Sequence, residues 1–230
     1  MLSVRDVSAH YGEATVLRGV SLDVAAGEVV TLVGRNGAGK TTLLRCLMGL
    51  HRSMTGVLDL DGRDIAKLAP HKRCRLGLGY VPDDRGVYAT LTVEENLTLP
   101  PAIGPGAWPL EKVYDTFPVL KARRKQAGTH LSGGEQQMLA VARVLRMGAR
   151  LLLADEPTEG LSPILVQQIG DIIRTVKEHG VTVLLIEQNI HFASTVADRH
   201  YLMSQGRIVE SLDNAEVERR EHELLEYLGI

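Results

Sequence analysis

The chain is poor in cysteine, in net charge and in long apolar runs, and each shortage excludes a class of protein. Its two cysteines, Cys46 and Cys74, form no spacing motif, so a reduced chain of the cell interior is the simplest interpretation. A formal net charge of −2 lacks the basic excess that is typical of nucleic-acid-binding proteins. No apolar run approaches the roughly 20 residues that cross a bilayer, and the N-terminus shows no signal-peptide pattern. We therefore expect no nucleic-acid partner, and we expect other chains to cross the membrane if the protein works at one.

The chain does have apolar segments of strand length that alternate with segments of helical length. Of its 230 residues, 44% are hydrophobic, which is enough for one large domain with a real core. Short alternating segments near the N-terminus predict antiparallel strands, and strands that alternate with helices in the second half predict a mostly parallel α/β sheet. A charge run over 216–226 predicts the solvated face of a terminal amphipathic helix, with a regulatory role as the alternative. The expected strands cover 2–10, 19–24, 28–33, 57–60, 79–81, 151–154 and 181–186, and the expected helices cover 43–48, 92–97, 110–117, 138–147 and 164–178.

The middle of the chain differs in character from the two ends. Helical segments surround a loop rich in proline and glycine at 100–106, which predicts a helical insertion into the sheet. We therefore expect residues 1–230 to form a single domain. Its sheet core covers about 1–82 and 150–230, and its helical subdomain covers about 83–149.

A glycine-rich loop at Gly34–Thr42 is the most informative stretch of the sequence. It follows the expected strand at 28–33 and opens into the expected helix at 43–48, which is the setting of a phosphate-binding loop. Glycines let backbone N–H groups turn toward an anion at a helix N-terminus. Lys40 is expected to reach the β- and γ-phosphates of ATP, and Thr41 to ligate Mg²⁺. The residues expected to hold the nucleotide here are Gly34, Asn36, Gly37, Ala38, Gly39, Lys40, Thr41 and Thr42.

Two carboxylates end the expected buried strand at 151–154. Asp155 and Glu156 should lie at the carboxyl edge of the sheet, where α/β sheets bind ligands. Asp155 is expected to hold Mg²⁺ through water, and Glu156 to orient or deprotonate an attacking water. A polar strand end is the plain alternative, and the phosphate-binding loop upstream favours the chemical interpretation.

A second glycine-containing helix start follows Leu131. Ser132 and the N–H groups of Gly133 and Gly134 are arranged to bind an anion. Ser132 with Glu135 three residues later also fits an ordinary capping box. A capping box does not need two glycines, which weaken a helix. Two helix starts of this kind suggest a nucleotide contacted from two sides.

The three segments together resemble the ATP-binding subunits of ABC transporters. The resemblance rests on 34–42, 131–137 and 151–156 in this order, and it covers essentially the whole chain. It implies the ABC ATPase fold, a P-loop NTPase core with a helical subdomain. It also implies that residues 131–137 of one subunit cap the ATP on the phosphate-binding loop of another. By the same resemblance, Tyr11 stacks on adenine with Val16 beside it.

Three positions depart from the general pattern of that family. Asp83 stands where a glutamine usually contacts Mg²⁺ and the attacking water, and its shorter side chain favours a hydrogen bond from that water or an approach to Mg²⁺ through an intervening water. The plain alternative is that Asp83 caps a turn after Pro82. Gln188 stands where a histidine usually contacts the γ-phosphate, and Ser162 replaces an aspartate. We expect Gly79 and Gly86, on either side of Asp83, to let this connection move.

These departures cluster as they do in one branch of the family. The chain is similar to the shorter ATP-binding subunit of bacterial branched-chain amino acid (Liv-type) importers. That similarity implies transmembrane permease subunits, a second ATP-binding subunit and a periplasmic or extracellular solute-binding protein as partners, at the cytoplasmic face of the membrane. It rests on residues 80–85, 91–97, 131–138, 157–163 and 186–189.

Three alternative functions stay open from the sequence. Urea and short-chain amide importers share much of the same motif set. A soluble ABC ATPase of repair, translation or cell division is a second alternative, although this chain has neither a second such domain nor a long coiled coil. A scaffold that binds nucleotide without hydrolysis is the third. Intact Lys40, Asp155 and Glu156 argue against the scaffold, whereas Gln188 keeps it open.

Overall fold

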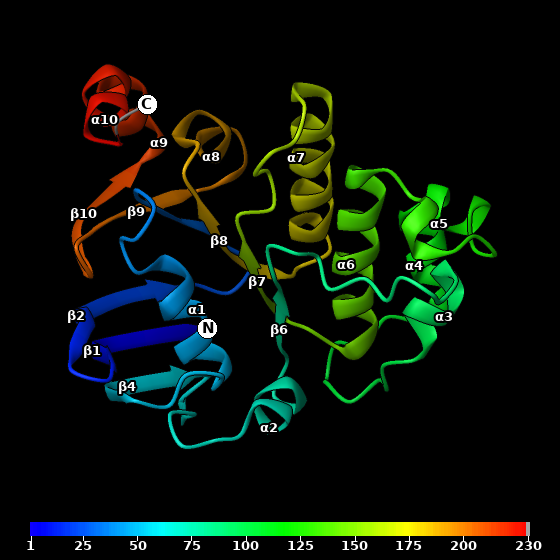
Figure 1. The fold of residues 1–230 in the computed structure, drawn as a ribbon, viewed down its shortest axis with the longest axis horizontal. Helices are drawn as coiled ribbons and strands as arrows, with labels where there is room; N and C mark the ends of the chain where they lie inside the picture. The colour runs from blue at the N-terminus through cyan, green and yellow to red at the C-terminus, as the bar shows by residue number, and fades with distance from the viewer. Residues whose placement is uncertain (229–230) are drawn as a thin grey trace.

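The computed structural model describes residues 1–228, and two β-sheets organise them (Figure 1). The larger sheet has six strands in the order β10-β9-β3-β8-β7-β6. Strands β9, β3, β8, β7 and β6 are parallel, and β10 pairs antiparallel with β9. The predicted mostly parallel sheet is confirmed. These strands are β3 (Val29–Val33), β6 (Leu78–Val81), β7 (Leu151–Asp155), β8 (Thr182–Glu187), β9 (Arg199–Ser204) and β10 (Arg207–Asp213).

The smaller sheet is antiparallel and comes from the N-terminal quarter of the chain. Its order is β2-β1-β4-β5, and a tight turn at Asp61-Gly62 joins β4 to β5. The antiparallel N-terminal part is therefore confirmed. The strands are β1 (Leu2–Tyr11), β2 (Ala14–Val24), β4 (Met54–Leu60) and β5 (Arg63–Asp64).

Alternation along the parallel strands divides the core into two layers. Val30 and Leu32 of β3 join the apolar cluster that also holds the small sheet and helix α1 (Lys40–Met48). Val29 of β3 and Leu185 of β8 join the cluster on the opposite face, with α6 (Gly133–Met147) and α7 (Pro163–Glu178). Strands β3, β7 and β8 are buried along their whole length because both faces are covered.

The remaining helices lie around these layers. Figure 1 shows α3, α4 and α5 beside α6, away from the small sheet. Their bounds are α2 (Pro70–Arg75), α3 (Val93–Thr98), α4 (Leu110–Thr116), α5 (Pro118–Ala122), η1 (Gly128–His130) and α8 (Ile190–Val196). Helix α6 begins at Gly133, five residues earlier than predicted, because Ser132 caps it.

The single terminal helix predicted over 216–226 is wrong, because the chain forms two helices there. Asp213 starts α9 (Asn214–Arg219) with a capping box, and Arg220 ends it before α10 (Glu221–Leu228). The Arg220 guanidinium donates to Glu223 at 2.8 and 2.9 Å and pairs with Glu210 of β10. That backbone break lets Arg220 tie the terminal helix to the sheet.

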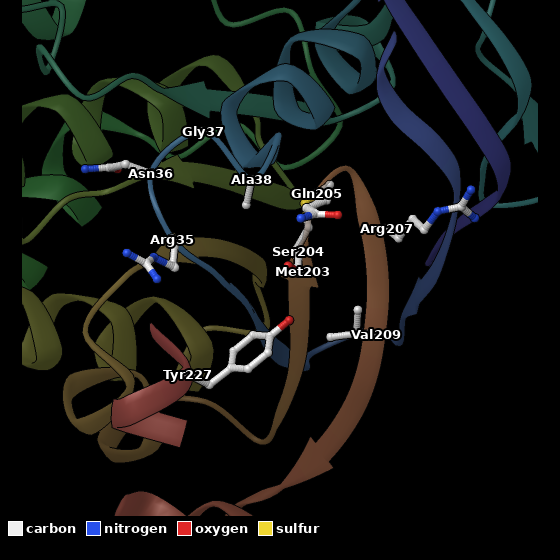
Figure 2. A pocket seen from close by; sticks show the side chains of 10 residues that line it. All are labelled: Arg35, Asn36, Gly37, Ala38, Met203, Ser204, Gln205, Arg207, Val209 and Tyr227. Atoms are coloured by element: carbon white, nitrogen blue, oxygen red, sulfur yellow. The ribbon is translucent and has the colours of Figure 1, made fainter. Parts of the chain in front are cut away.

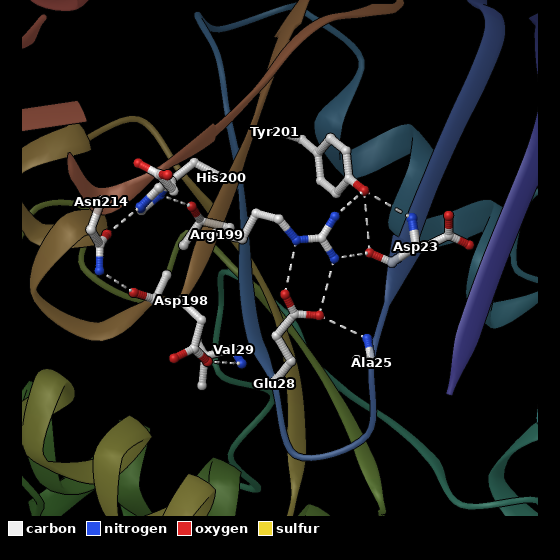
Figure 3. Close-up of polar contacts among 12 residues, drawn as sticks. Asp23, Ala25, Glu28, Val29, Asp198, Arg199, His200, Tyr201 and Asn214 are labelled. Atoms are coloured by element: carbon white, nitrogen blue, oxygen red, sulfur yellow. Dashed lines mark hydrogen bonds and ion pairs between the residues drawn. The ribbon is translucent and has the colours of Figure 1, made fainter. Parts of the chain in front are cut away.

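Polar contacts join the two sheets at the amino ends of β3 and β9 (Figure 3). Arg199 donates from Nε to Glu28 Oε1 at 2.9 Å and from Nη2 to Glu28 Oε2 at 3.1 Å. Its Nη2 also donates to the Asp23 carbonyl at 2.9 Å, and its Nη1 to the Tyr201 hydroxyl at 2.6 Å. A forked pair of this kind fixes orientation as well as distance. These contacts hold the end of β2 against the amino ends of β3 and β9.

Candidate nucleotide and catalytic site

The phosphate-binding loop, residues 34–42, joins β3 to α1 at the carboxyl edge of the parallel sheet. Two of its glycines are required by space. A Cβ on Gly34 would lie 2.4 Å from the Met203 carbonyl oxygen, and Gly39, with φ 108°, would meet a Leu17 methyl at 2.9 Å. The loop is thus packed against β9 and β2. That packing holds its backbone in one conformation.

A pocket of 640 Å³ lies along one flank of this loop (Figure 2). The β9–β10 turn forms its opposite wall, and the Tyr227 side chain of α10 points toward that turn (Figure 2). The lining residues are Arg35, Asn36, Gly37, Ala38, Met203, Ser204, Gln205, Arg207, Val209 and Tyr227.

Lys40 is buried and fully engaged. Its side chain is 3% exposed, and Nζ donates to the carbonyl oxygens of Gly34 at 2.7 Å and Arg35 at 3.2 Å. The third contact is an ion pair with Glu156 Oε1 at 3.0 Å. Because an ammonium group has three donors, these contacts use all of them. The loop lysine is thus held by the expected catalytic carboxylate.

Glu156 sits in a strained turn directly after β7. Its φ of 44° lies in the left-handed region, which costs energy for a residue with a side chain. Its N–H donates to the Ile186 carbonyl of β8 at 3.1 Å. Gln188 Nε2 donates to Glu156 Oε2 at 3.0 Å. One carboxylate oxygen therefore faces Lys40 and the other faces Gln188, so the structure brings these three predicted residues together.

Asp155 lies one residue earlier and receives two hydroxyl groups. Thr41 Oγ1 donates to its Oδ1 at 3.1 Å, and the Tyr80 hydroxyl to its Oδ2 at 3.1 Å. Burial raises the pKa of Asp155 although these hydrogen bonds lower it, and the charges of Asp83 and Glu156 raise it further. Burial and the Asp155 charge also raise the pKa of Tyr80. The sequence did not single out Tyr80, although its place at the carboxyl end of a short strand was a usable signal.

Asp83 is exposed and bonds within its own turn. Its Oδ1 accepts from the next N–H, that of Asp84, at 3.0 Å, while the two-residue Asx contact of this turn is made by Asp84 Oδ1 with the Gly86 N–H at 2.9 Å. Its charge nevertheless reaches Asp155. The turn is tied to α6 by Arg85, which donates to Gln136 Oε1 at 3.1 Å. Gly79 lies within β6, and a Cβ there would lie 2.1 Å from a Val144 methyl, so packing also accounts for this glycine. Movement of the connection stays a prediction.

The segment Leu131–Gln137 lies apart from the Lys40 cluster. Ser132 and Glu135 form a reciprocal capping box, with Ser132 N to Glu135 Oε2 at 2.8 Å and Glu135 N to Ser132 Oγ at 3.3 Å. A Cβ on Gly134 would lie 2.7 Å from the Gln168 amide oxygen of α7, the movable end of an exposed side chain, so this glycine is closely packed within the chain but not required by space. Ser132 and Glu135 line a pocket of their own against α5 and α7. In one chain they do not meet the phosphate-binding loop.

Tyr11 and Val16 lie on the small sheet. Tyr11 ends β1, is 45% exposed, and its ring centroid lies 4.3 Å from that of His51. Val16 is half-buried in β2, with its carbonyl oxygen close to Gly206 of the β9–β10 turn. The sequence did not predict His51 as the ring neighbour of Tyr11.

Glu187 is a buried carboxylate that the sequence analysis did not single out. It is 2% exposed at the end of β8, and Thr158 Oγ1 donates to its two oxygens at 2.9 and 3.0 Å. Burial raises its pKa to about 7, against the hydrogen bond from Thr158. The signal was available, because a run of polar residues follows a buried strand here.

A phosphate-binding loop, a strand-end Asp-Glu pair and a separate Ser-Gly-Gly helix start define a P-loop ATPase of the ATP-binding cassette class. The profile of the family described as "ABC transporter" matches residues 17–159. No helix within residues 1–228 has the length and apolar character needed to cross a membrane.

Curated relatives are similar along nearly the whole chain. A high-affinity branched-chain amino acid transport ATP-binding protein, BraG of Pseudomonas aeruginosa, is 44% identical over 218 residues, covering 91% of each chain. A probable branched-chain amino acid transport ATP-binding protein, LivF of Archaeoglobus fulgidus, is 37% identical, covering 99% of this chain and 98% of its own. A lipopolysaccharide export system ATP-binding protein, LptB of Acidithiobacillus ferridurans, is 35% identical over 91% of this chain and 88% of its own.

Solved structures agree on the fold. The ATP-binding subunit of an ABC transporter superposes with a TM-score of 0.82 at 27% identity, covering all of both chains. The dimeric, post-hydrolysis cassette MJ0796 bound to ADP and Pi has a TM-score of 0.78 at 25% identity, covering 93% of this chain and 99% of its own. The chain therefore belongs to the ABC transporter family, and it is an ATPase. Cassettes of this family bind adenine nucleotides, form dimers and serve transporters.

Proposed function

We propose that this chain binds and hydrolyses ATP to power import of branched-chain or other hydrophobic amino acids through membrane-spanning permease subunits. The ATPase part rests on one observation, the contact of Glu156 with both Lys40 and Gln188 at the edge of the parallel sheet. The solute class rests on the 44% identity to BraG and 37% identity to LivF. The proposal places the chain at the cytoplasmic face of the membrane, with a solute-binding protein outside.

In this proposal ATP exchanges partners with Glu156. Phosphate oxygens bind the N–H groups of the phosphate-binding loop at the start of α1, where the helix dipole favours an anion. The Lys40 ammonium group then leaves Glu156 and pairs with the β- and γ-phosphates. Released from that ion pair, Glu156 accepts a proton from the attacking water, while Gln188 stays a neutral hydrogen-bond partner of the γ-phosphate. Tyr11, with Val16 beside it, stacks on the adenine.

The donor set of Thr41 and Asp155 fits Mg²⁺. Both offer oxygen, and their 3.1 Å contact places a hydroxyl and a carboxylate on one site. Mg²⁺ commonly takes only one or two protein oxygens and completes its shell with phosphate and water. When bound, the ion neutralises phosphate charge. Asp83 is proposed to act near it only through water, since its carboxylate serves its own turn.

We further propose that two ATP-binding subunits complete each site. Ser132, Gly133, Gly134 and Glu135 lie apart from Lys40 in one chain, so they are free to cap a nucleotide held by another. The second subunit is proposed to be the longer ATP-binding chain of a Liv-type importer. A native complex that contains only two copies of this chain would contradict that part.

The function is tested in the assembled transporter. We expect the chain to purify with its permease partners, and labelled leucine, isoleucine or valine to be taken up by vesicles that hold the complex, its binding protein and ATP. Uptake of urea or short amides instead would move the assignment to that class of importer. ATP turnover without any membrane partner in the native complex would favour a soluble ABC ATPase.

The role of Asp83 needs its own variant. Asp83→Ala in the assembled transporter should impair uptake and change the Mg²⁺ dependence of ATP hydrolysis, while ATP binding is largely kept. Unchanged uptake and metal dependence, with only a small loss of thermal stability, would leave Asp83 as a turn cap. Asp84→Ala is the matched control, because Asp84 accepts only from the Gly86 N–H of the same turn.

A further inference from the structure

The turn that carries Glu156 is tied to the end of β8 at two points. The first is the Glu156 N–H, which donates to the Ile186 carbonyl at 3.1 Å. The second is Thr158 Oγ1, which donates to both carboxylate oxygens of Glu187. The same strand end continues into Gln188, which contacts the Glu156 side chain. Glu187 and Thr158 therefore link the two polypeptide segments that hold the proposed catalytic carboxylate and its amide partner.

Burial of these two polar side chains costs free energy, and a functional role would explain why the chain keeps them. Glu187 is 2% and Thr158 is 7% exposed, so water does not solvate the polar atoms of either side chain. A buried carboxylate costs free energy unless donors satisfy it, and an apolar pair of similar volume would fill the space without that cost. The charged group that faces Glu187 is Glu156, whose negative charge makes the position still less favourable.

The strained backbone of Glu156 indicates the role of the contact between Thr158 and Glu187. Glu156 keeps a left-handed φ of 44°, and such a conformation persists only where the surroundings over-determine it. Without the Thr158 hydroxyl contact, the turn would keep only backbone hydrogen bonds to the end of β8, from Glu156 to Ile186 and from Thr158 to Glu187, beside the Gln188 contact that the turn itself positions. A relaxed turn would carry the Glu156 carboxylate away from Gln188.

We infer that Glu187 is a positioning residue for ATP hydrolysis: through Thr158 it holds the strained Glu156 turn beside Gln188. The inference rests on the proposed role of Glu156. Neither Glu187 nor Thr158 is placed in contact with nucleotide, so ATP binding by the phosphate-binding loop should not depend on them. Hydrolysis should depend on them strongly.

The test compares variants that lose the hydrogen bond with variants that keep it. Thr158→Val and Glu187→Met preserve shape, and each should lower kcat about 10- to 100-fold, the order expected for a misplaced catalytic group. KM for ATP should stay within about twofold. Thr158→Ser and Glu187→Gln retain a donor and an acceptor, and should restore most of kcat. Thr182→Val is the matched control, since it removes a buried threonine hydroxyl, the acceptor of the Gly27 N–H, at the other end of β8.

A second measurement separates positioning from general stability. In a Glu156→Gln background, Thr158→Val should cause no further loss of the residual turnover, because the group it positions is gone. A kcat for Thr158→Val equal to that of Thr182→Val, or an equal loss in the Glu156→Gln background, overturns the inference. If the unaltered chain shows no ATP hydrolysis at all, the proposed function fails instead.

Discussion

The two edges of the parallel sheet use the same chemical pair, a cation with a glutamate, for opposite purposes. At the amino edge, Arg199 holds Glu28 through two parallel hydrogen bonds and is itself held by Tyr201. At the carboxyl edge, the single Nζ of Lys40 contacts one oxygen of Glu156, whose backbone is strained. The guanidinium pair is planar and fixed, whereas an ammonium on a flexible stem exchanges partners readily. We therefore read the first pair as structural and the second as one that ATP displaces.

Ser132→Arg should have the largest effect, because it blocks the proposed capping of the opposite subunit's nucleotide. ATP affinity of the isolated chain should stay nearly unchanged, while dimerisation and turnover are lost. Equilibrium binding of a fluorescent ATP analogue and light scattering measure the two. Ser132→Ala removes the hydroxyl and its helix cap without adding bulk or charge, costs about 1 kcal/mol of stability, and separates loss of the hydroxyl from the block by arginine. A large loss of ATP binding by the monomer would show that the segment acts within its own chain.

Glu187→Gln should change the pH dependence of stability at the carboxyl edge. The folded-state pKa of Glu187 is raised by burial to about 7, from 4.5. The folded state therefore binds a proton more tightly, and wild-type stability from this group is lost as pH rises from about 4.5 through about 7. The neutral variant should gain on wild type by about 2 kcal/mol between pH 5 and pH 8. Thermal unfolding at several pH values measures the gain, and the exposed Glu178→Gln is the control; parallel curves for Glu187→Gln and wild type would contradict the burial of a charge.

Arg199→Met should act on stability at the amino edge and leave turnover per folded molecule unchanged. Loss of a charged, partly buried hydrogen-bonded pair costs about 2 kcal/mol. Burial opposes ionisation of Glu28, but hydrogen bonds from Arg199 and from the Ala25 N–H prevail and lower its pKa below 4.5. The contribution is thus present above pH 4.5 and is lost as pH falls through the lowered value. Arg5→Met, which breaks an exposed ion pair with Asp23, is the control. A fall in kcat for Arg199→Met would contradict the purely structural role given to the pair at the amino edge.

Gln188→Ala should lower turnover about tenfold, which corresponds to about 1.4 kcal/mol in the activation barrier. It removes the 3.0 Å hydrogen bond to Glu156 Oε2. An amide does not titrate between pH 5 and 8, so Gln188→His should retain activity and gain a pH step that the native chain lacks. Rates measured from pH 5.5 to 8.5 show the step. An alanine variant as active as the native chain would show that Gln188 takes no part in turnover.

Local signals predicted the phosphate-binding loop, the buried strands β3, β7 and β8 and the Asp155-Glu156 pair, because each combines an apolar run with residues of special backbone or chemistry. Contacts between distant segments were not predictable in this way. Nothing near Glu187 in the sequence points to Thr158, and nothing near Tyr80 points to Asp155. The terminal charge run was assigned to one helix because periodicity alone does not show that Arg220 pairs with Glu210 of β10. Gly134 illustrates a mixed case, since its expected role toward an anion coexists with packing against Gln168.

The most direct test of the account is the turnover of Glu156→Gln beside that of Glu178→Gln, an exposed glutamate at the end of α7. We expect Glu156→Gln to bind ATP normally, to hydrolyse it about 10²- to 10⁴-fold more slowly, and to accumulate as an ATP-bound dimer in gel filtration, while Glu178→Gln turns over at nearly the native rate. Native turnover by Glu156→Gln would contradict the central claim, because Lys40 would then release a carboxylate that takes no part in the reaction.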